Sequence, residues 1–139
     1  MGTQSFFIAG TLPFILLGAL HIIYTLIDIR MPTRFAPYKD EVRLSMLGST
    51  LMVTRQTNMW RAWLGLNISH GLGALFFGLA YLAIAEFDFE LLIRVPALLY
   101  LAPFMALCYV ILSVKYWFNV PAIVTSLGFA CFAAGVFVS

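Results

Sequence analysis

The most informative segment of this chain reads WRAWLGLNISHGLGALFFGLAYLAIA from residue 60 to residue 85. Its only formally charged side chain is Arg61, which stands next to the start of the segment. A helix needs about 20 consecutive, mostly apolar residues to cross the hydrocarbon of a bilayer. The segment exceeds that length, so it predicts a transmembrane helix.

The composition of the whole chain excludes a water-soluble domain. Of its 139 residues, 63% are hydrophobic and 10% are charged, whereas soluble domains are about 45–50% apolar and about 25% charged. A short chain has an unfavourable surface-to-volume ratio and cannot hide so much apolar surface from water. Disordered chains are poor in apolar residues, so disorder is excluded as well. We therefore expect the lipid bilayer to cover most of the surface.

Three further segments are long and apolar enough to span a bilayer, and they cover residues 6–29, 91–114 and 120–138. Helices satisfy their own backbone hydrogen bonds in hydrocarbon, and the alternating pattern of a membrane β-barrel is absent. The expected fold is all-α: an integral membrane, up-down bundle of four transmembrane helices. Residues 1–139 are predicted to form a single transmembrane domain.

Positive charge is concentrated in the loop of residues 30–59, between the first two spans. The positive-inside rule places this loop in the cytoplasm, which puts both termini outside the cytoplasm in a cell (inner) membrane. Residues 38–53 form either an amphipathic helix on the membrane surface or a solvated linker, and the sequence leaves both open. The cations of this region are Arg30, Arg34, Lys39, Arg43, Arg55 and, just inside the next span, Arg61.

Small residues recur every four positions in two of the spans. Close helix packing in membranes depends on such residues because lipid supplies little hydrophobic drive between helices. The two ridges therefore predict close helix–helix contacts, within one chain or between chains. They consist of Gly65, Ser69 and Gly73 in the second span, and of Ala122, Ser126, Ala130 and Ala134 in the fourth.

Both histidines lie inside predicted spans, where ionisable residues are costly and mark a candidate site. His21 lies about 12 Å from residue 29, and His70 lies about 15 Å from Trp60, at 1.5 Å per helical residue. In adjacent antiparallel helices the two imidazoles should therefore share one level near the middle of the bilayer. A polar column is expected to continue from them to the cytoplasmic face, with Asp28 paired to Arg61; its further members are Tyr24, Thr25, Trp63 and Asn67.

Three interpretations of this column are open. Its groups could satisfy one another and fix the register of two helices. His21 and His70 could instead be the axial ligands of a haem b in a redox protein. They could also contribute to a metal site, or to a small-ligand or proton carrier.

No nucleophile motif, phosphate-binding loop or zinc-protease motif occurs in the chain. There is also no basic stripe or motif for nucleic acid. The sequence therefore assigns no enzymatic activity and favours a non-enzymatic role. We expect a small polytopic membrane protein that either self-associates as a homo-oligomer or joins other membrane subunits as an accessory or structural subunit.

Two segments carry a resemblance to a known group of proteins. They are HIIYTLIDIRMPTRFAPY, residues 21–38, and MWRAWLGLNISHGLGALFFGL, residues 59–79. Together they resemble a family of small, uncharacterised four-span integral membrane proteins of bacteria. The resemblance implies the four-span architecture and no catalytic roles.

Overall fold

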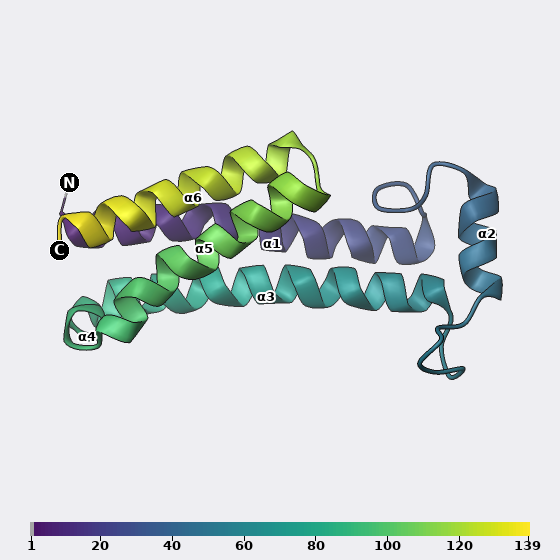
Figure 1. Cartoon of the computed structure of the whole chain (residues 1–139), viewed down its shortest axis with the longest axis horizontal. Coiled ribbons are helices and arrows are strands. Elements are labelled where there is room, and N and C mark those ends of the chain that lie inside the picture. Colours follow the sequence, from purple (N-terminus) through teal and green to yellow (C-terminus); the bar gives the residue numbers. More distant parts are fainter. Residues whose placement is uncertain (1) are drawn as a thin grey trace. The chain divides into compact units, whose positions relative to one another are not determined.

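A computed structural model of the chain describes residues 2–139. Within that range the regular structure is helical, apart from an isolated antiparallel bridge between Thr50 and Asn58. The expected all-α fold is therefore confirmed (Figure 1). The helices are α1 (Thr3–Arg30), α2 (Asp40–Gly48), α3 (Met59–Phe87), α4 (Phe89–Arg94), α5 (Pro96–Tyr116) and α6 (Asn119–Phe137).

Four of these helices, α1, α3, α5 and α6, are long and apolar enough to cross a membrane. They coincide with the four predicted spans, and the chain is thus a multi-pass membrane protein. The third predicted span differs at its start, because the structure places a separate short helix, α4, before α5. Asp88 caps α4 by accepting the backbone N–H of Leu91, and Pro96 disfavours helical geometry at the residue before it.

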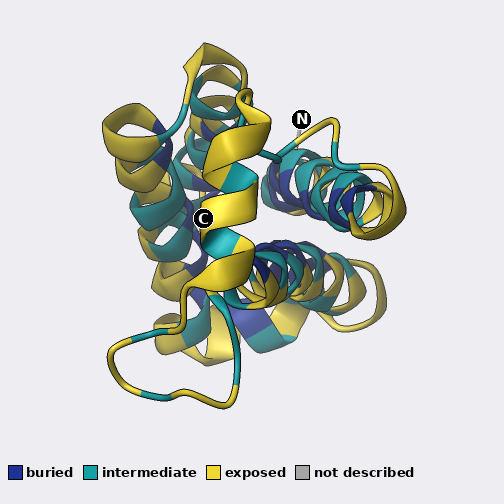
Figure 2. Cartoon of the chain, turned by 90° about the vertical axis from the view of Figure 1, so that its right-hand side faces the viewer, coloured by how far each residue is buried: buried dark blue, intermediate teal, exposed yellow. Residues whose placement is uncertain are grey.

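The contacts divide the described chain into two compact units. One consists of residues 2–17 together with Ala74–Ser139, and the other of Gly18–Gly73. Buried residues lie on the inward sides of the helices and exposed residues on the outside and in the loops (Figure 2).

An aromatic cluster forms the core of the first unit. Phe14 of α1 is almost completely buried. Its ring contacts Phe77 of α3 at 4.9 Å, Tyr109 of α5 at 5.5 Å and Phe132 of α6 at 6.2 Å between centroids. Aromatic pairs in such geometries contribute about 0.5–1.5 kcal/mol each beyond the area that they bury. Phe14 therefore links α1 to the three other long helices.

Glycines let α1 approach its neighbours in this unit. A Cβ built on Gly78 of α3 would lie 2.6 Å from Ile15 Cγ1 and 3.1 Å from the carbonyl oxygen of Thr11. On α6, a Cβ at Gly128 would lie 2.6 Å from Phe14 Cε2. These positions have no room for a side chain, so α1 packs tightly on both α3 and α6.

The two predicted small-residue ridges are not the surfaces that make these contacts. Gly65, Ser69 and Gly73 are all exposed, and a Cβ built on Gly65 meets no atom within 4 Å. On α6 the exposed residues include Ser126 and Ala130. Its buried face is formed instead by Thr125, Gly128, Phe132 and Gly135.

The ends of α1 and α6 meet at one end of the first unit, where the Thr3 hydroxyl donates to the carbonyl oxygen of Val138 at 3.2 Å (Figure 1). Gln4 is anchored nearby, because its side-chain amide donates to the carbonyl oxygen of Ala85 at 2.8 Å. The start of α1 and the end of α6 therefore lie side by side.

Candidate functional site

The two histidines meet in the second unit, between α1 and α3. The imidazole rings of His21 and His70 lie 5.1 Å apart between centroids, with an interplanar angle of 62°. The expectation that two neighbouring antiparallel helices bring them to one level is therefore confirmed. His21 is nine residues from Arg30, and His70 is nine residues from Arg61, so each ring lies about 14 Å along its helix from the nearest terminal arginine.

Asn67 forms a hydrogen bond with His21 and determines which nitrogen of that imidazole carries the proton. Its side-chain N–H donates to the carbonyl oxygen of Trp63 at 2.8 Å, so its Oδ1 faces His21 Nε2 at 2.9 Å. A carboxamide oxygen only accepts hydrogen bonds, and neutral imidazole carries its proton on one nitrogen. The hydrogen-bond network therefore assigns the Nε2–H tautomer to His21, with Nδ1 as the acceptor.

Gly71 allows the two helices to come close enough for this contact. A Cβ on Gly71 would lie 2.8 Å from Ile22 Cγ1, 3.1 Å from the carbonyl oxygen of Gly18 and 3.2 Å from the backbone nitrogen of Ile22. The backbone of α1 thus rests directly against α3 beside His70. We name the group of His21, Asn67 and His70 the histidine–asparagine cluster.

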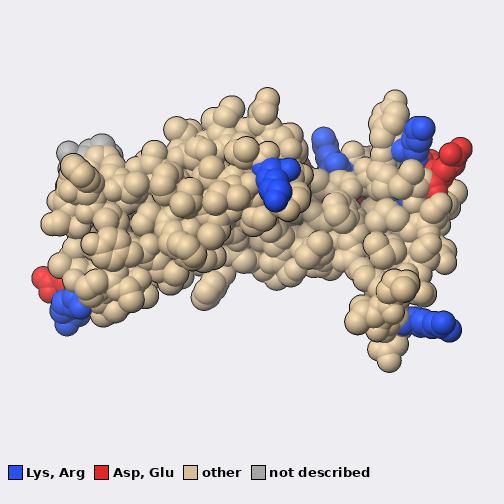
Figure 3. Space-filling view, in the orientation of Figure 1, with Lys and Arg blue, Asp and Glu red and all other residues tan. Residues whose placement is uncertain are grey.

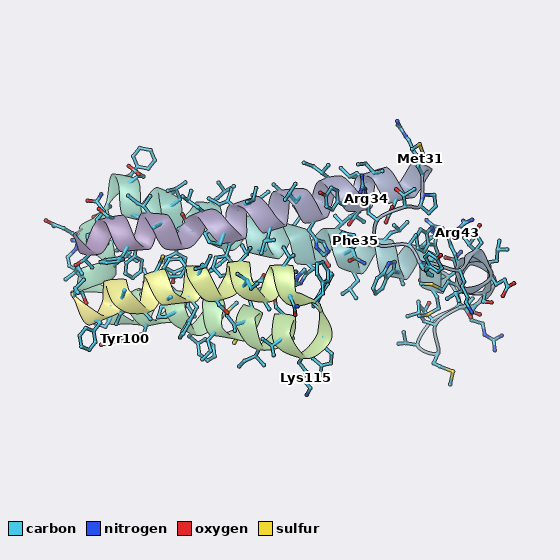
Figure 4. The ribbon with its side chains drawn as sticks, turned by 90° about the horizontal axis from the view of Figure 1, so that it is seen from above. Met31, Arg34, Phe35, Arg43, Tyr100 and Lys115 are labelled. Carbon is cyan, nitrogen blue, oxygen red and sulfur yellow. The ribbon has the colours of Figure 1, made fainter. Side chains whose placement is uncertain are left out.

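A residue from the connecting segment covers this cluster. The ring of Phe35 lies 4.5 Å from that of His21, tilted by 30°, and 6.1 Å from that of Tyr24. The indole N–H of Trp63 donates to the carbonyl oxygen of Phe35 at 3.0 Å. Figure 4 labels Phe35 and Arg34 beside the end of α1. The chain therefore turns back after α1 and places an aromatic ring against the imidazole.

Asp28 holds that turn. Its carboxylate accepts the backbone N–H groups of Thr33 at 2.7 Å, Arg34 at 2.8 Å and Phe35 at 2.6 Å, and the residue is completely buried. A buried charge has to be paired or hydrogen-bonded, and charge-assisted bonds of this kind are short and strong. Asp28 is therefore the anchor of the turn that carries Phe35.

The predicted pairing of Asp28 with Arg61 is wrong: the carboxylate accepts three backbone amides instead, and the ion pairs within 4 Å among residues 2–139 do not include these two residues. Arg61 lies on the exposed start of α3, where its backbone N–H donates to the side chain of Asn58 at 2.9 Å. Tyr24 lies under the guanidinium of Arg34, which is 5.3 Å from the centroid of its ring. Thr25 is buried and donates to the carbonyl oxygen of His21 at 2.7 Å, within its own helix.

Phe35 was not among the site residues predicted from the sequence. Two signals could have indicated it: the acidic residue close to the end of an apolar helix, and a single large aromatic residue between Pro32 and Pro37. An aspartate at that place has to find donors in the chain that follows, which turns the chain back on the helix.

Haem b does not fit this arrangement. Axial imidazoles approach the iron from opposite faces of the porphyrin, and imidazole nitrogens bind metals at about 2 Å. The rings of His21 and His70 instead contact each other edge to face, and Gly71 leaves no space between the helices beside them. Among residues 2–139, no group of three or more His, Cys, Asp or Glu side chains could hold a metal ion.

The arrangement is suited to holding two helices in register through a polar contact in an apolar interface. Interhelical hydrogen bonds in membranes contribute about 0.6 kcal/mol on average.

Comparison of the chain with protein-family models, curated proteins and solved structures finds no match.

Proposed function

We propose that this multi-pass membrane protein acts by associating with other transmembrane helices, as a homo-oligomer or as an accessory subunit of a larger membrane complex. The observation that carries the proposal is the exposed small-residue face of α3, formed by Gly65, Ser69 and Gly73. Small residues in this spacing let the backbones of two membrane helices approach each other.

Three glycines of α3 differ in the space around them. Gly71 and Gly78 are required by the close approach of α1. Gly65 has no such requirement within the chain, since a Cβ there would meet open space. A glycine inside a helix costs about 1 kcal/mol relative to alanine. A close contact between Gly65 and a helix of a neighbouring molecule would offset this cost.

The proposal includes the orientation that the charges favour. Six of the eight Lys and Arg residues lie between residues 30 and 61, which supports a cytoplasmic position for that segment in an inner membrane and an outer position for both termini. Cysteine variants at Thr3 and Met52, labelled in intact cells with a membrane-impermeant reagent, test it. Labelling of the Met52 variant from outside would contradict the orientation.

The association is tested by the mass of the protein in mild detergent and by photobleaching steps of single labelled molecules in lipid vesicles. We expect oligomers or a stoichiometric membrane partner, and a loss of about tenfold or more in the association constant for Gly65→Leu/Gly73→Leu, because two bulky side chains separate the backbones. Ala97→Leu introduces a leucine at an exposed position of α5 and should leave the association constant unchanged. A monomer at every concentration, without a partner, would contradict the proposal.

A second candidate is the movement of protons, supported by the contact of two imidazoles inside a membrane span. Acidification of vesicles that contain the protein and a trapped pH dye tests this candidate. His70→Phe and His21→Phe should each abolish a protein-dependent flux, whereas Leu16→Phe, at an exposed position of α1, should leave it intact. Absence of any flux with the unmodified protein would eliminate the candidate.

A further inference from the structure

The segment between α1 and α3 contains most of the positive charge of the protein. Six of the eight Lys and Arg residues stand between residues 30 and 61, where the only carboxylates are Asp40 and Glu41. Figure 3 shows charged atoms gathered in a few patches, with a broad uncharged surface between them. Because α1 and α3 are both long enough to span the membrane, the segment begins and ends at the same membrane face.

Two anchors keep the segment close to that face. At its start, Asp28 binds three consecutive amides of residues 33–35. At its end, the backbone N–H of Met59 donates to the carbonyl oxygen of Ser49 at 2.9 Å, next to the bridge between Thr50 and Asn58. Only residues 36–48 lie between the anchors, so α2 cannot move far from the ends of α1 and α3.

The helix held in this way exposes apolar side chains. No residue of α2 is buried. Val42, Leu44 and Leu47 are 47%, 58% and 39% exposed. Met52 and Val53, in the loop that follows, are even more exposed. Apolar side chains next to a bilayer are removed from water when they enter the boundary between headgroups and acyl chains.

The cations of the segment are largely uncompensated. Among the residues that the structure describes, Arg43 is the only one of the six with a carboxylate within 4 Å, and its partner Asp40 is exposed. Arg34 lies over the ring of Tyr24 instead. Figure 4 places Arg43 in the α2 region and Arg34 beside the end of α1. A positive surface next to a bilayer attracts anionic lipid headgroups.

We propose that the segment of residues 30–61 binds the anionic phospholipids of its own membrane leaflet. In this arrangement α2 lies at the interface, with Leu44 and Leu47, which are three residues apart on one side of the helix, at the boundary of the acyl chains. Lys39, Arg43 and Arg55 then contact the phosphate groups. Apolar exposure and uncompensated positive charge occur on the same short segment, and an anionic lipid surface satisfies both.

The test uses the whole protein in lipid nanodiscs. Leu44→Cys, in a chain that also carries Cys108→Ala and Cys131→Ala, is labelled with a fluorophore that brightens and shifts to the blue in apolar surroundings. We expect this change in phosphatidylcholine–phosphatidylglycerol bilayers and not in pure phosphatidylcholine, with reversal at high salt. Inorganic phosphate added to pure phosphatidylcholine discs should produce no shift, which separates the lipid surface from free phosphate.

A charge variant gives the decisive comparison. Lys39→Gln/Arg43→Gln/Arg55→Gln should remove the response to phosphatidylglycerol, because each cation near an anionic surface contributes about fivefold to membrane affinity. Arg94→Gln/Lys115→Gln, outside the segment, should keep the response, and circular dichroism confirms that both variants fold. Equal emission in neutral and anionic bilayers, as expected if an acidic protein were the partner, would overturn the proposal. A response retained by the triple variant would overturn it as well.

Discussion

The ring of Phe35 lies 4.5 Å from the imidazole of His21, although the two residues belong to a loop and to the interior of a membrane helix. The carboxylate of Asp28 makes this possible by accepting the amides of residues 33–35. The polar contact between α1 and α3 is thus closed on one side by the chain that connects them.

Asp28→Asn should loosen the turn. An amide retains one carbonyl oxygen but places an N–H group against backbone N–H donors, so at least one charge-assisted bond is lost. Such bonds contribute about 1.5–3 kcal/mol each. We expect a loss of that size in the free energy of unfolding and faster trypsin cleavage at Arg34 and Lys39. Glu90→Gln, at an exposed position of α4, is the matched control, and equal cleavage rates in the two variants would contradict the role of Asp28.

The proton of neutral His21 should lie on Nε2. Nitrogen-15 chemical shifts of the selectively labelled protein in bicelles distinguish the two tautomers. Asn67→Leu should abolish the preference because it removes the acceptor. Ser69→Ala changes an exposed residue of the same helix and should preserve it. An Nδ1–H tautomer in the unmodified protein would show that the assigned hydrogen-bond network is wrong.

Leucine at Gly78 should destabilise the fold much more than leucine at Gly65. At Gly78 the new side chain collides with Ile15 and with the backbone of Thr11, whereas at Gly65 it enters open space. Overpacking costs about 1–3 kcal/mol or more, and unfolding in mixed detergent measures it. A similar loss of stability for both variants of the monomeric protein would refute the packing described for α3.

Phe14→Ala should be among the most harmful changes in the first unit. The ring contacts three other helices, and truncating a buried phenylalanine costs about 3–5 kcal/mol. Leu16→Ala, at a residue that is 57% exposed, is the control and should cost far less. Comparable midpoints of unfolding for the two variants would argue against the aromatic cluster as the core.

The architecture follows closely from the sequence because hydrocarbon imposes one strong rule: an apolar segment of sufficient length forms a helix. The equal depth of His21 and His70 in the membrane also follows from the sequence. Each histidine is nine residues from an arginine near the end of its helix, and the rise per residue converts that number into a distance. The partners of Asp28 could not be predicted in this way. They are backbone amides, which every residue carries, and only the path of the turn selects them.

The packing surfaces show a second limit. Small-residue spacing indicated the face of Gly65, Ser69 and Gly73, whereas the contact with α1 uses Gly71 and Gly78. Gly71 and Gly78 are seven residues apart, so a search for small residues at every fourth position does not find them. Ile15 and Ile22 of α1 determine which glycines of α3 are used, because their side chains pack against Gly78 and Gly71. The sequence of α3 alone carries no information about these partners.

The hydrogen bonds of Asp28 reach only five to seven residues along the chain, whereas the bond between His21 and Asn67 spans 46. During synthesis the first helix emerges before the second, and local contacts can form at once. The turn after α1 can therefore be complete while α3 is still being translated. The nascent chain then offers the incoming α3 a preassembled surface, in which the carboxylate of Asp28 already has its three hydrogen-bond donors.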